Sequence, residues 1–281
     1  MKKAELVLLV LLCSASLLSA GNWGDKTFNK SVEISGQGKY EIFIDVDAGE
    51  VTVTKSNKAN TLSVFMEYEE KYFQERMKIQ KDRRRIKIVL KHRGSIFKSG
   101  DKHAVVNIEL PSNTDLYIDS RIKAGEVKMD LGGIPIKELS LKNWAGESTV
   151  TFYEPNPVVM DFLGINVKVG EAYIEKLGNA RALEMDINSG VGSLYVDFNG
   201  DLVDGAKVKI DIDIGEASVT MPENAGIKFK IAGLFKFMSA KDIDPEFYRR
   251  GSYYYSEDFE TMKKKIFVRI TPGLGELSIS R

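Results

Sequence analysis

The chain has 281 residues, and its 40 Lys and Arg residues balance 40 Asp and Glu residues, so that the formal net charge is zero. This balance argues against nucleic acid as a partner. The one cysteine, Cys13, lies in an N-terminal segment that we expect to be removed. The mature chain then has no thiol, which excludes disulfides, thiolate nucleophiles and cysteine metal sites.

Residues 1–20 have the pattern of a secretory signal peptide. A basic start precedes an apolar run at residues 6–12, and Leu18-Ser19-Ala20 supplies small residues before a cleavage site. The run is shorter than the roughly 20 apolar residues that a membrane-spanning helix needs, so a retained anchor is the weaker alternative. A lipid anchor on Cys13 is also weaker, because the residues before it are large. We therefore expect cleavage near Ala20, export to the periplasm or the cell surface, and no membrane span in the mature chain.

Residues 21–110 are expected to form an N-terminal β-meander joined to the rest of the chain. Apolar and polar residues alternate at 62–68, 86–90 and 105–110, the pattern of strands with one buried face. The stretch 69–80 is ambiguous and could hold a helical turn. The basic run at residues 81–85 is interpreted as a solvated hairpin tip. Contact with anionic lipid head groups or glycans is the alternative.

A glycine between two runs of alternating apolar residues recurs along the chain, followed by glutamate in six copies and by serine in one. From Gly125 to Gly215 the steps are 21, 24, 22 and 23 residues. A fixed period of this size indicates stacked supersecondary units rather than a single globular core. The seven glycines are Gly49, Gly125, Gly146, Gly170, Gly192, Gly215 and Gly275.

Each glycine also marks a change in which positions face inward. Before Gly215 the apolar residues occupy even positions from Val208 to Ile214, whereas after it they occupy odd positions from Ala217 to Met221. One residue has been inserted at the glycine, as in a β-bulge or a corner whose first residue has a positive φ. A side chain at such a position costs roughly 1–2 kcal/mol, which favours glycine.

Two columns of apolar residues accompany the glycines. The residue directly before each glycine and the residue four positions after it are always apolar, and we expect both columns to line the inside of the stack. The sequence therefore predicts an all-β fold after the signal peptide. Its main part, residues 111–281, is predicted to be a single-stranded, β-helix-like β-solenoid with coils of about 22 residues.

The last coil is expected to be widened by an insertion at residues 240–262, which is rich in tyrosine and charge. Tyrosine and arginine together are enriched in binding hot spots, so the insertion is a candidate for partner binding. The interpretation that we favour is a cap over the open end of the solenoid, since terminal coils must be covered. With this interpretation we expect Phe247 and Phe259 to be buried and at least one tyrosine to be exposed. The candidate partner-binding residues are Arg249, Arg250, Tyr253, Tyr254 and Tyr255.

Acidic side chains offer two candidate chemistries, neither of which we favour. Stacked coils would place the glutamates after the glycines about 4.8 Å apart, where they could bind Ca²⁺, but the neighbouring outward columns do not stay acidic. Asp45, Asp47 and Glu50 share an outward face, as the carboxylates of polysaccharide lyases do, yet the spacing assigns them no basic partner. The two histidines, His92 and His103, lie near loop glycines without a third ligand. We expect no catalytic residue, cofactor or metal.

The closing part of the chain carries a family resemblance. Residues 244–255, the strand 266–270 and Gly273-Leu274-Gly275-Glu276-Leu277, together with residues 44–53, resemble the bacterial toast-rack and LiaF-like cell-envelope domains, often labelled adhesins. The resemblance covers essentially the whole mature chain. It implies a β-solenoid at the cell envelope, in a family linked to envelope stress, and it supplies no catalytic residues. The chain lacks the several N-terminal membrane helices of LiaF-type proteins, which argues against a direct role in signalling.

These patterns predict a non-catalytic, exported cell-envelope or surface protein. It would act as an adhesin-like or envelope-stress-related interaction module, and its partner would be a protein, a glycan or another envelope component. The alternative is a carbohydrate-active β-helix enzyme such as a polysaccharide lyase. The two hypotheses differ in that only the enzyme turns over a glycan.

Overall fold

A computed structural model shows an all-β chain whose strands form one open sheet that does not close on itself. Among the residues that it describes, the one helical element is the short 3-10 helix η2 (Leu177–Ala180), and no helix is long and apolar enough to cross a membrane. Residues 1–20, interpreted as a signal peptide, and His103 lie outside the described residues. The described residues are 26–34, 38–94, 104–233 and 238–281.

The strands in the N-terminal half of the chain are short, whereas several in the C-terminal half are about twice as long. In chain order they are β1 (Lys26–Glu33), β2 (Tyr40–Val46), β3 (Glu50–Lys55), β4 (Thr61–Tyr68), β5 (Phe73–Gln80), β6 (Arg85–His92), β7 (Ala104–Leu110), β8 (Leu116–Ile122), β9 (Val127–Asp130), β10 (Ile136–Asn143), β11 (Ser148–Thr151), β12 (Met160–Glu175), β13 (Ala182–Asp197), β14 (Ala206–Thr220), β15 (Gly226–Ile231), β16 (Met238–Ile243), β17 (Phe247–Arg250), β18 (Tyr253–Ser256) and β19 (Lys265–Ser280).

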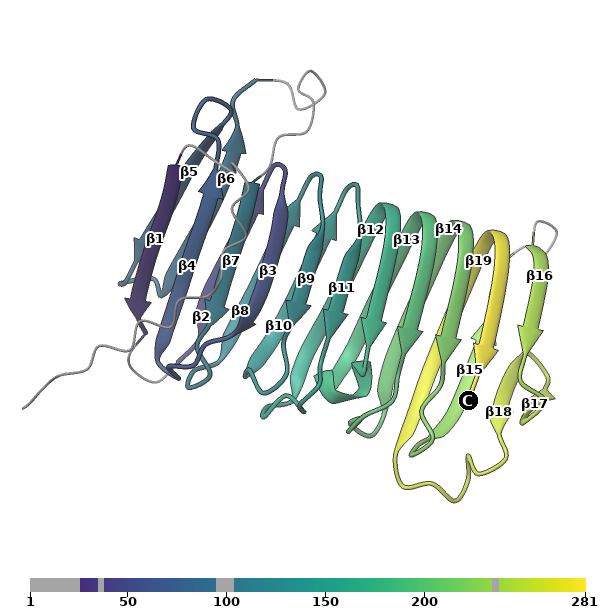
Figure 1. The fold of residues 1–281 in the computed structure, drawn as a ribbon. Coiled ribbons are helices and arrows are strands. Elements are labelled where there is room, and N and C mark those ends of the chain that lie inside the picture. The colour runs from purple at the N-terminus through teal and green to yellow at the C-terminus, as the bar shows by residue number, and fades with distance from the viewer. Residues whose placement is uncertain (1–25, 35–37, 95–103, 234–237) are drawn as a thin grey trace, which may run out of the picture.

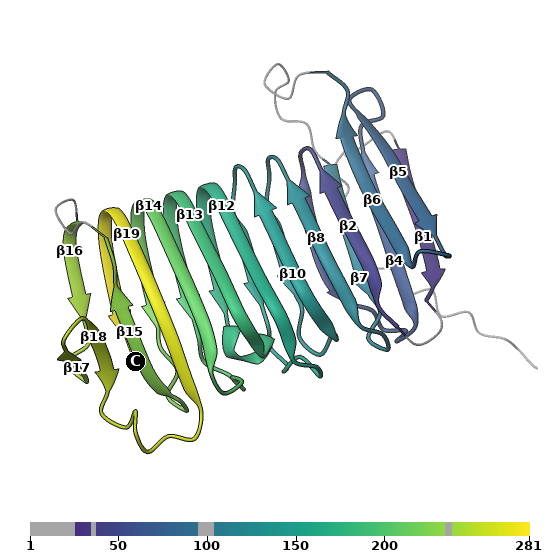
Figure 2. The ribbon, with the colours of Figure 1, turned by 180° about the vertical axis from the view of Figure 1, so that it is seen from behind.

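The chain winds so that its strands lie in two walls that face each other across the core (Figures 1 and 2). The first wall contains, in spatial order, β5, β6, β2, β8 and β10, the N-terminal halves of β12, β13, β14 and β19, and then β15, β18 and β17. The second wall contains β1, β4, β7, β3, β9 and β11, the C-terminal halves of the same four long strands, and β16. Neighbours are parallel within the stack and antiparallel only near its two ends.

The recurring glycines form the corner where the chain passes from the first wall to the second. All seven have φ between 122° and 138°, a region that disfavours any side chain. They also lie directly on one another. A Cβ atom added to Gly192 would lie 1.8 Å from the carbonyl oxygen of Gly170, and one added to Gly215 would lie 1.7 Å from that of Gly192. Each corner therefore needs glycine for its dihedral angles and for the close approach of the next coil.

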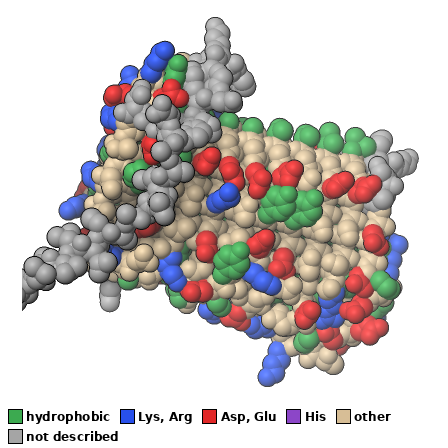
Figure 3. Space-filling view, viewed as in Figure 1, with side chains coloured by type: hydrophobic (Ala, Val, Ile, Leu, Met, Phe, Trp, Pro, Cys, Tyr) green, Lys and Arg blue, Asp and Glu red, His purple; other side chains and the backbone are tan. Residues whose placement is uncertain are grey.

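The two apolar columns beside the glycines differ in burial. The column four residues after each glycine is buried, as predicted, with exposed fractions of 0–2%. The prediction for the residue before the glycine holds for Ala48, which packs against the core, but it is wrong for Val169, Val191, Ile214 and Leu274, which are 47–52% exposed. The chain changes walls within a few residues there, so the last side chain before the glycine points away from the core. These residues are in register along the corner edge, where Figure 3 shows a row of hydrophobic side chains.

Two coils lie out of chain order, which the sequence did not indicate. The coil of β2 and β3 lies between β8–β9 and β6–β7, and β19 lies between β14 and the coil of β15 and β16. Residues 61–110 are therefore not a meander, since β4 and β5 lie in different walls. Strands β6 and β7 instead extend both walls by parallel pairing, which lengthens the core. The ambiguous stretch 69–80 consists of a turn followed by β5.

Candidate functional site

The outer face of the first wall carries a straight row of side chains that crosses the strands from β6 to β17. Each residue of this row is the register partner of the next. Seven of them lie eight residues before a corner glycine, which is why the repeat brings them into line. We call this set the transverse row. In spatial order it consists of Arg85, Glu41, Tyr117, Glu138, Phe162, Glu184, Lys207, Phe267, Lys228, Tyr255 and Tyr248.

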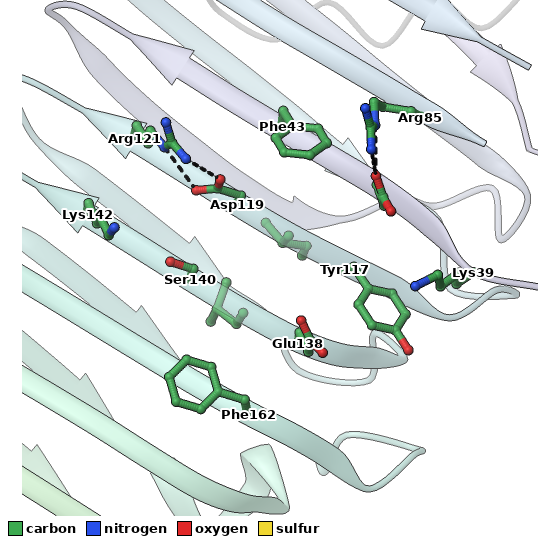
Figure 4. A pocket seen from close by; sticks show the side chains of 13 residues that line it. Lys39, Phe43, Arg85, Tyr117, Asp119, Arg121, Glu138, Ser140, Lys142 and Phe162 are labelled. Atoms are coloured by element: carbon green, nitrogen blue, oxygen red, sulfur yellow. Dashed lines mark hydrogen bonds and ion pairs between the residues drawn. The ribbon is translucent and has the colours of Figure 1, made fainter. Parts of the chain in front are cut away.

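Two hollows border the N-terminal part of the transverse row. The larger has a volume of about 450 Å³ and is lined in part by Phe43, Tyr117 and Phe162, whose rings lie on the outer side of the strands (Figure 4). The smaller has a volume of about 260 Å³, also borders Phe162, and extends to Asp186 and Asn188 of β13. The outer, solvent-facing surface of the first wall is therefore concave around Phe162.

Phe162 is positioned by a glycine two residues further along the same strand. A Cβ atom at Gly164 would lie 2.9 Å from Cε1 and 3.2 Å from Cζ of the Phe162 ring. The ring edge therefore occupies the space above the Gly164 backbone, so the ring lies against the sheet. Phe162 remains 38% exposed. One side of the ring is supported by the strand, and the other is available to a ligand.

Charged groups accompany the aromatic rings of the row. The Nη2 atom of Arg85 lies 2.5 Å from Oε2 of Glu41, and the Nζ atom of Lys39 lies 4.4 Å from the ring centroid of Tyr117. Burial, followed by the nearby carboxylate of Glu138, raises the pKa of Tyr117. Its hydroxyl therefore stays protonated at neutral pH and can donate a hydrogen bond.

The tyrosine-rich insertion forms the hairpin of β17 and β18, and one side of this hairpin covers the end of the core. Phe247 is 6% exposed, and its ring meets that of Phe229 edge-on with centroids 5.2 Å apart. Tyr254 stacks on the same Phe229 ring at 4.8 Å. Phe229 belongs to β15 and is fully buried. This side of the hairpin is therefore a cap.

The other side of the hairpin continues the transverse row. Tyr248, which is 45% exposed, stacks with Tyr255 at 5.8 Å. The Tyr255 ring meets Phe259 at 5.3 Å, and Phe259 meets Phe267 at 6.4 Å. The expectation that Phe259 is buried is wrong: it is half-buried, because it lies in this outer chain of rings rather than in the core.

The five residues proposed for partner binding divide between the two sides of the hairpin. Arg249 and Tyr254 are register partners, and the Arg249 guanidinium lies 5.8 Å from the Tyr254 ring on the capping side. Arg250 pairs in register with Tyr253. The Nζ atom of Lys228 lies 4.5 Å from the ring centroid of Tyr253 and 5.4 Å from that of Tyr255, so these two tyrosines belong to the outer side.

The glutamates that follow the corner glycines lie on the outer face of the second wall. Glu171, Ser193, Glu216 and Glu276 are register partners, and Figure 3 shows a row of acidic side chains beside the hydrophobic row. The hydroxyl of Tyr173 donates a hydrogen bond to Glu171, and its ring stacks on Tyr195 at 4.9 Å. In the described part of the chain, no three His, Cys, Asp or Glu side chains form a group that could hold a metal ion.

Asp45 and Asp47, considered above as lyase-type carboxylates, do not share an open face with Glu50. Asp47 is 5% exposed. The Nζ atom of Lys91 lies 2.6 Å from Asp45 and 3.0 Å from Asp47, and the Nζ atom of Lys123 lies 2.9 Å from Asp47. The chain begins its corner at Asp47, so the carboxylate is covered by lysines from the strands on both sides. The spacing in the sequence could not show these partners because they lie far away along the chain.

The Asp47 carboxylate is expected to stabilise the protein in a pH-dependent way. Burial alone would raise the pKa of Asp47, but hydrogen bonds from Lys123, from Lys91 and from the backbone N–H of His92 outweigh it and lower the pKa. A carboxyl group with a depressed pKa contributes stability above its unfolded pKa and loses it as the pH falls through its folded pKa. We expect Asp47→Asn to lower the free energy of unfolding at pH 7 by about 1.5–3 kcal/mol, the range for hydrogen bonds to charged groups.

Denaturant unfolding of both proteins between pH 7 and pH 2 measures this contribution. The difference between wild type and Asp47→Asn should persist down to about pH 4, the ordinary carboxyl range, and shrink below it. Asp213→Asn is the matched control, because Asp213 also lies two residues before a corner glycine but is exposed. A difference that is the same at pH 7 and at pH 2 would contradict the ionic role of Asp47.

The fold and this face together define a repeat-like, all-β protein with an extended outer surface of aromatic and charged side chains. Residues 22–160 match the family described as the N-terminal domain of toast_rack, DUF2154. This match shows that the chain contains a toast-rack family domain.

Two solved structures align with the chain over 98% of their own length. One is a "putative cell adhesion protein" from Clostridium sporogenes ATCC 15579, with 20% identity, a TM-score of 0.44 and 91% of this chain covered. Another is a "putative adhesin" from Bacteroides fragilis NCTC 9343, with 14% identity, a TM-score of 0.41 and 91% of this chain covered. No curated protein matches the chain.

Proposed function

We propose that the mature chain is an exported, non-catalytic and adhesin-like interaction module of the cell envelope or cell surface. In this proposal it is a β-solenoid with coils of about 22 residues, and it binds its partner through the outer face of the first wall. The transverse row is the observation that carries the proposal. Among the described residues, all of its strands except β17 already pair with neighbours on both sides, so recognition there comes from side chains. Tyrosine and arginine are enriched in binding hot spots, and aromatic residues in general, phenylalanine included, are enriched in interfaces.

Four carboxylates of the protein are unsuited to act as general acids. General acid catalysis needs a carboxyl group whose pKa is raised toward neutral pH. The pKa values of Asp47, Glu75, Asp201 and Asp258 are instead lowered. These carboxylates stay ionised at neutral pH, which suits ion pairing and not proton donation.

Cell fractionation combined with an envelope-binding assay tests this function. The full chain should be recovered outside the cytoplasm with its N-terminus cut near Ala20, and the purified exported protein should sediment with isolated cell envelopes. It should release no oligosaccharide from those envelopes. An uncut chain in the cytoplasm, or the release of shortened glycans, would overturn the proposal.

A further inference from the structure

The transverse row has a repeat of its own, in which aromatic rings stand between charged side chains. Tyr117, Phe162 and Phe267 lie at the same position of three different coils, and Phe162 and Phe267 are each 38% exposed. Five strand spacings separate Tyr117 from Phe267, which is roughly 24 Å at about 4.8 Å per strand. Such a length exceeds what a single small ligand would occupy and fits an extended, linear one.

The charges of the row decide between classes of linear partner. Three of its members are acidic, Glu41, Glu138 and Glu184, and three are basic, Arg85, Lys207 and Lys228. The row is therefore balanced, whereas a nucleic acid or an anionic lipid surface is bound by an excess of Lys and Arg. A peptide added as a strand needs an open sheet edge, and the row lies on the face of the wall.

The aromatic and charged side chains of the transverse row match the chemistry of sugar rings. An aromatic face carries partial negative charge and attracts the polarised C–H groups that line one side of a pyranose. Carboxylates accept hydrogen bonds from hydroxyl groups, and lysine and arginine donate to them. The ring of Phe162, supported from below by Gly164, presents such a face between two hollows.

We infer that the transverse row binds a linear, uncharged polysaccharide that runs along the stack, with sugar rings packed on Tyr117, Phe162 and Phe267 and hydroxyl groups bonded to the charged residues between them. This inference rests on the proposed function and specifies its ligand class. It is distinct from a lyase reaction because no bond is broken.

Affinity electrophoresis of the purified exported protein in gels that contain hydroxyethyl cellulose or glucomannan tests the inference. Migration should be retarded by at least one of these polysaccharides and not by polygalacturonate, which is linear but anionic. The double variant Phe162→Ala/Phe267→Ala should bind about tenfold more weakly, the change expected when about 1.4 kcal/mol is lost at a hot spot. Calorimetry should show tighter binding of cellohexaose or chitohexaose than of the corresponding disaccharides, because only the longer chains reach several rings.

The matched control is Tyr173→Ala/Tyr195→Ala on the second wall, where Tyr195 is also 38% exposed. This variant removes the same kind of side chain and should bind like the wild type, and both double variants should keep the wild-type thermal midpoint. Retardation by neither uncharged polysaccharide, retardation by polygalacturonate alone, or an equal loss in both double variants would overturn the inference. A protein that sediments with envelopes but binds none of these glycans would refute the ligand class and leave the proposed function standing.

Discussion

Replacement of Gly192 by alanine is expected to lower the free energy of unfolding by about 2–5 kcal/mol. Roughly 1–2 kcal/mol of this comes from forcing a side chain into a positive φ, since Gly192 has a φ of 138°. About 1–3 kcal/mol more comes from overpacking, because the new Cβ would lie 1.8 Å from the carbonyl oxygen of Gly170. The coils that carry Gly170 and Gly192 must separate to admit it.

Two other glycines separate these contributions. Gly205 has a φ of 77°, but a Cβ there would meet nothing within 4 Å, so Gly205→Ala should show only the cost of the dihedral angle. Gly190 has no such positive φ, but a Cβ there would lie 2.3 Å from the Lys168 carbonyl oxygen, so Gly190→Ala should show mainly the steric cost. Denaturant melts of the three variants compare them directly. If Gly192→Ala lost no more stability than Gly205→Ala, the tight stacking of the corners would be disproved.

The double need for glycine at the corner explains why so much of the fold was visible in the sequence. Because no other residue type fits the corner, glycine recurs once per coil, and this recurrence reveals the period of the repeat. The change from even to odd apolar positions beside each glycine predicts the corner. The apolar column that ends at Ile279 was predicted correctly because β-strand alternation holds within a wall. Alternation does not hold across a change of walls. That is why the same reasoning failed for Val169 and for Leu274, which point outward from the corner.

The order of the coils could not be predicted, because the strands that compete for a place in the stack have the same alternating pattern. The alternation of apolar and polar residues in β19 does not indicate that this strand pairs with β14 as well as with β16. The buried asparagines were missed for a similar reason. The Nδ2 atom of Asn156 donates to the carbonyl oxygens of Ile136, at 2.8 Å, and of Ala180, at 3.2 Å, and so joins three successive turns. In the sequence Asn156 is only a polar residue in a Pro-rich loop.

The transverse row does have a signal in the sequence. Tyr117, Phe162 and Phe267 each lie eight residues before a corner glycine. Positions that build a core are apolar in every coil, and such uniform columns are easy to recognise in a sequence. A binding face has no such requirement, and the charged residues between the rings hid this column. A binding face in a repeat protein is therefore better recognised by outward positions that carry aromatic residues in some coils and charged residues in others.

Substitutions on the two sides of the tyrosine-rich hairpin are expected to differ strongly in their effect on stability. Phe247→Ala should lower the free energy of unfolding by about 3–5 kcal/mol, the usual cost of truncating a buried phenylalanine, because its ring packs edge-on against Phe229. Tyr248→Ala, one residue further along the strand, should change it by about 0.5 kcal/mol or less, because Tyr248 faces solvent. Denaturant melts measure both variants, and Tyr248→Ala is the control for the loss of an aromatic ring from the same strand.

Hydrogen exchange shows where the stability is lost. In a stack each coil contacts only its neighbours, so removal of the cap should open the terminal coil first. Backbone amides of β15 should therefore exchange faster in Phe247→Ala, and those of β12 should keep the wild-type rate. A wild-type midpoint for Phe247→Ala would refute the cap. A loss of stability in Tyr248→Ala as large as that in Phe247→Ala would show that the outer side also holds the hairpin in place, and the transverse row could then not end in residues that are free to bind.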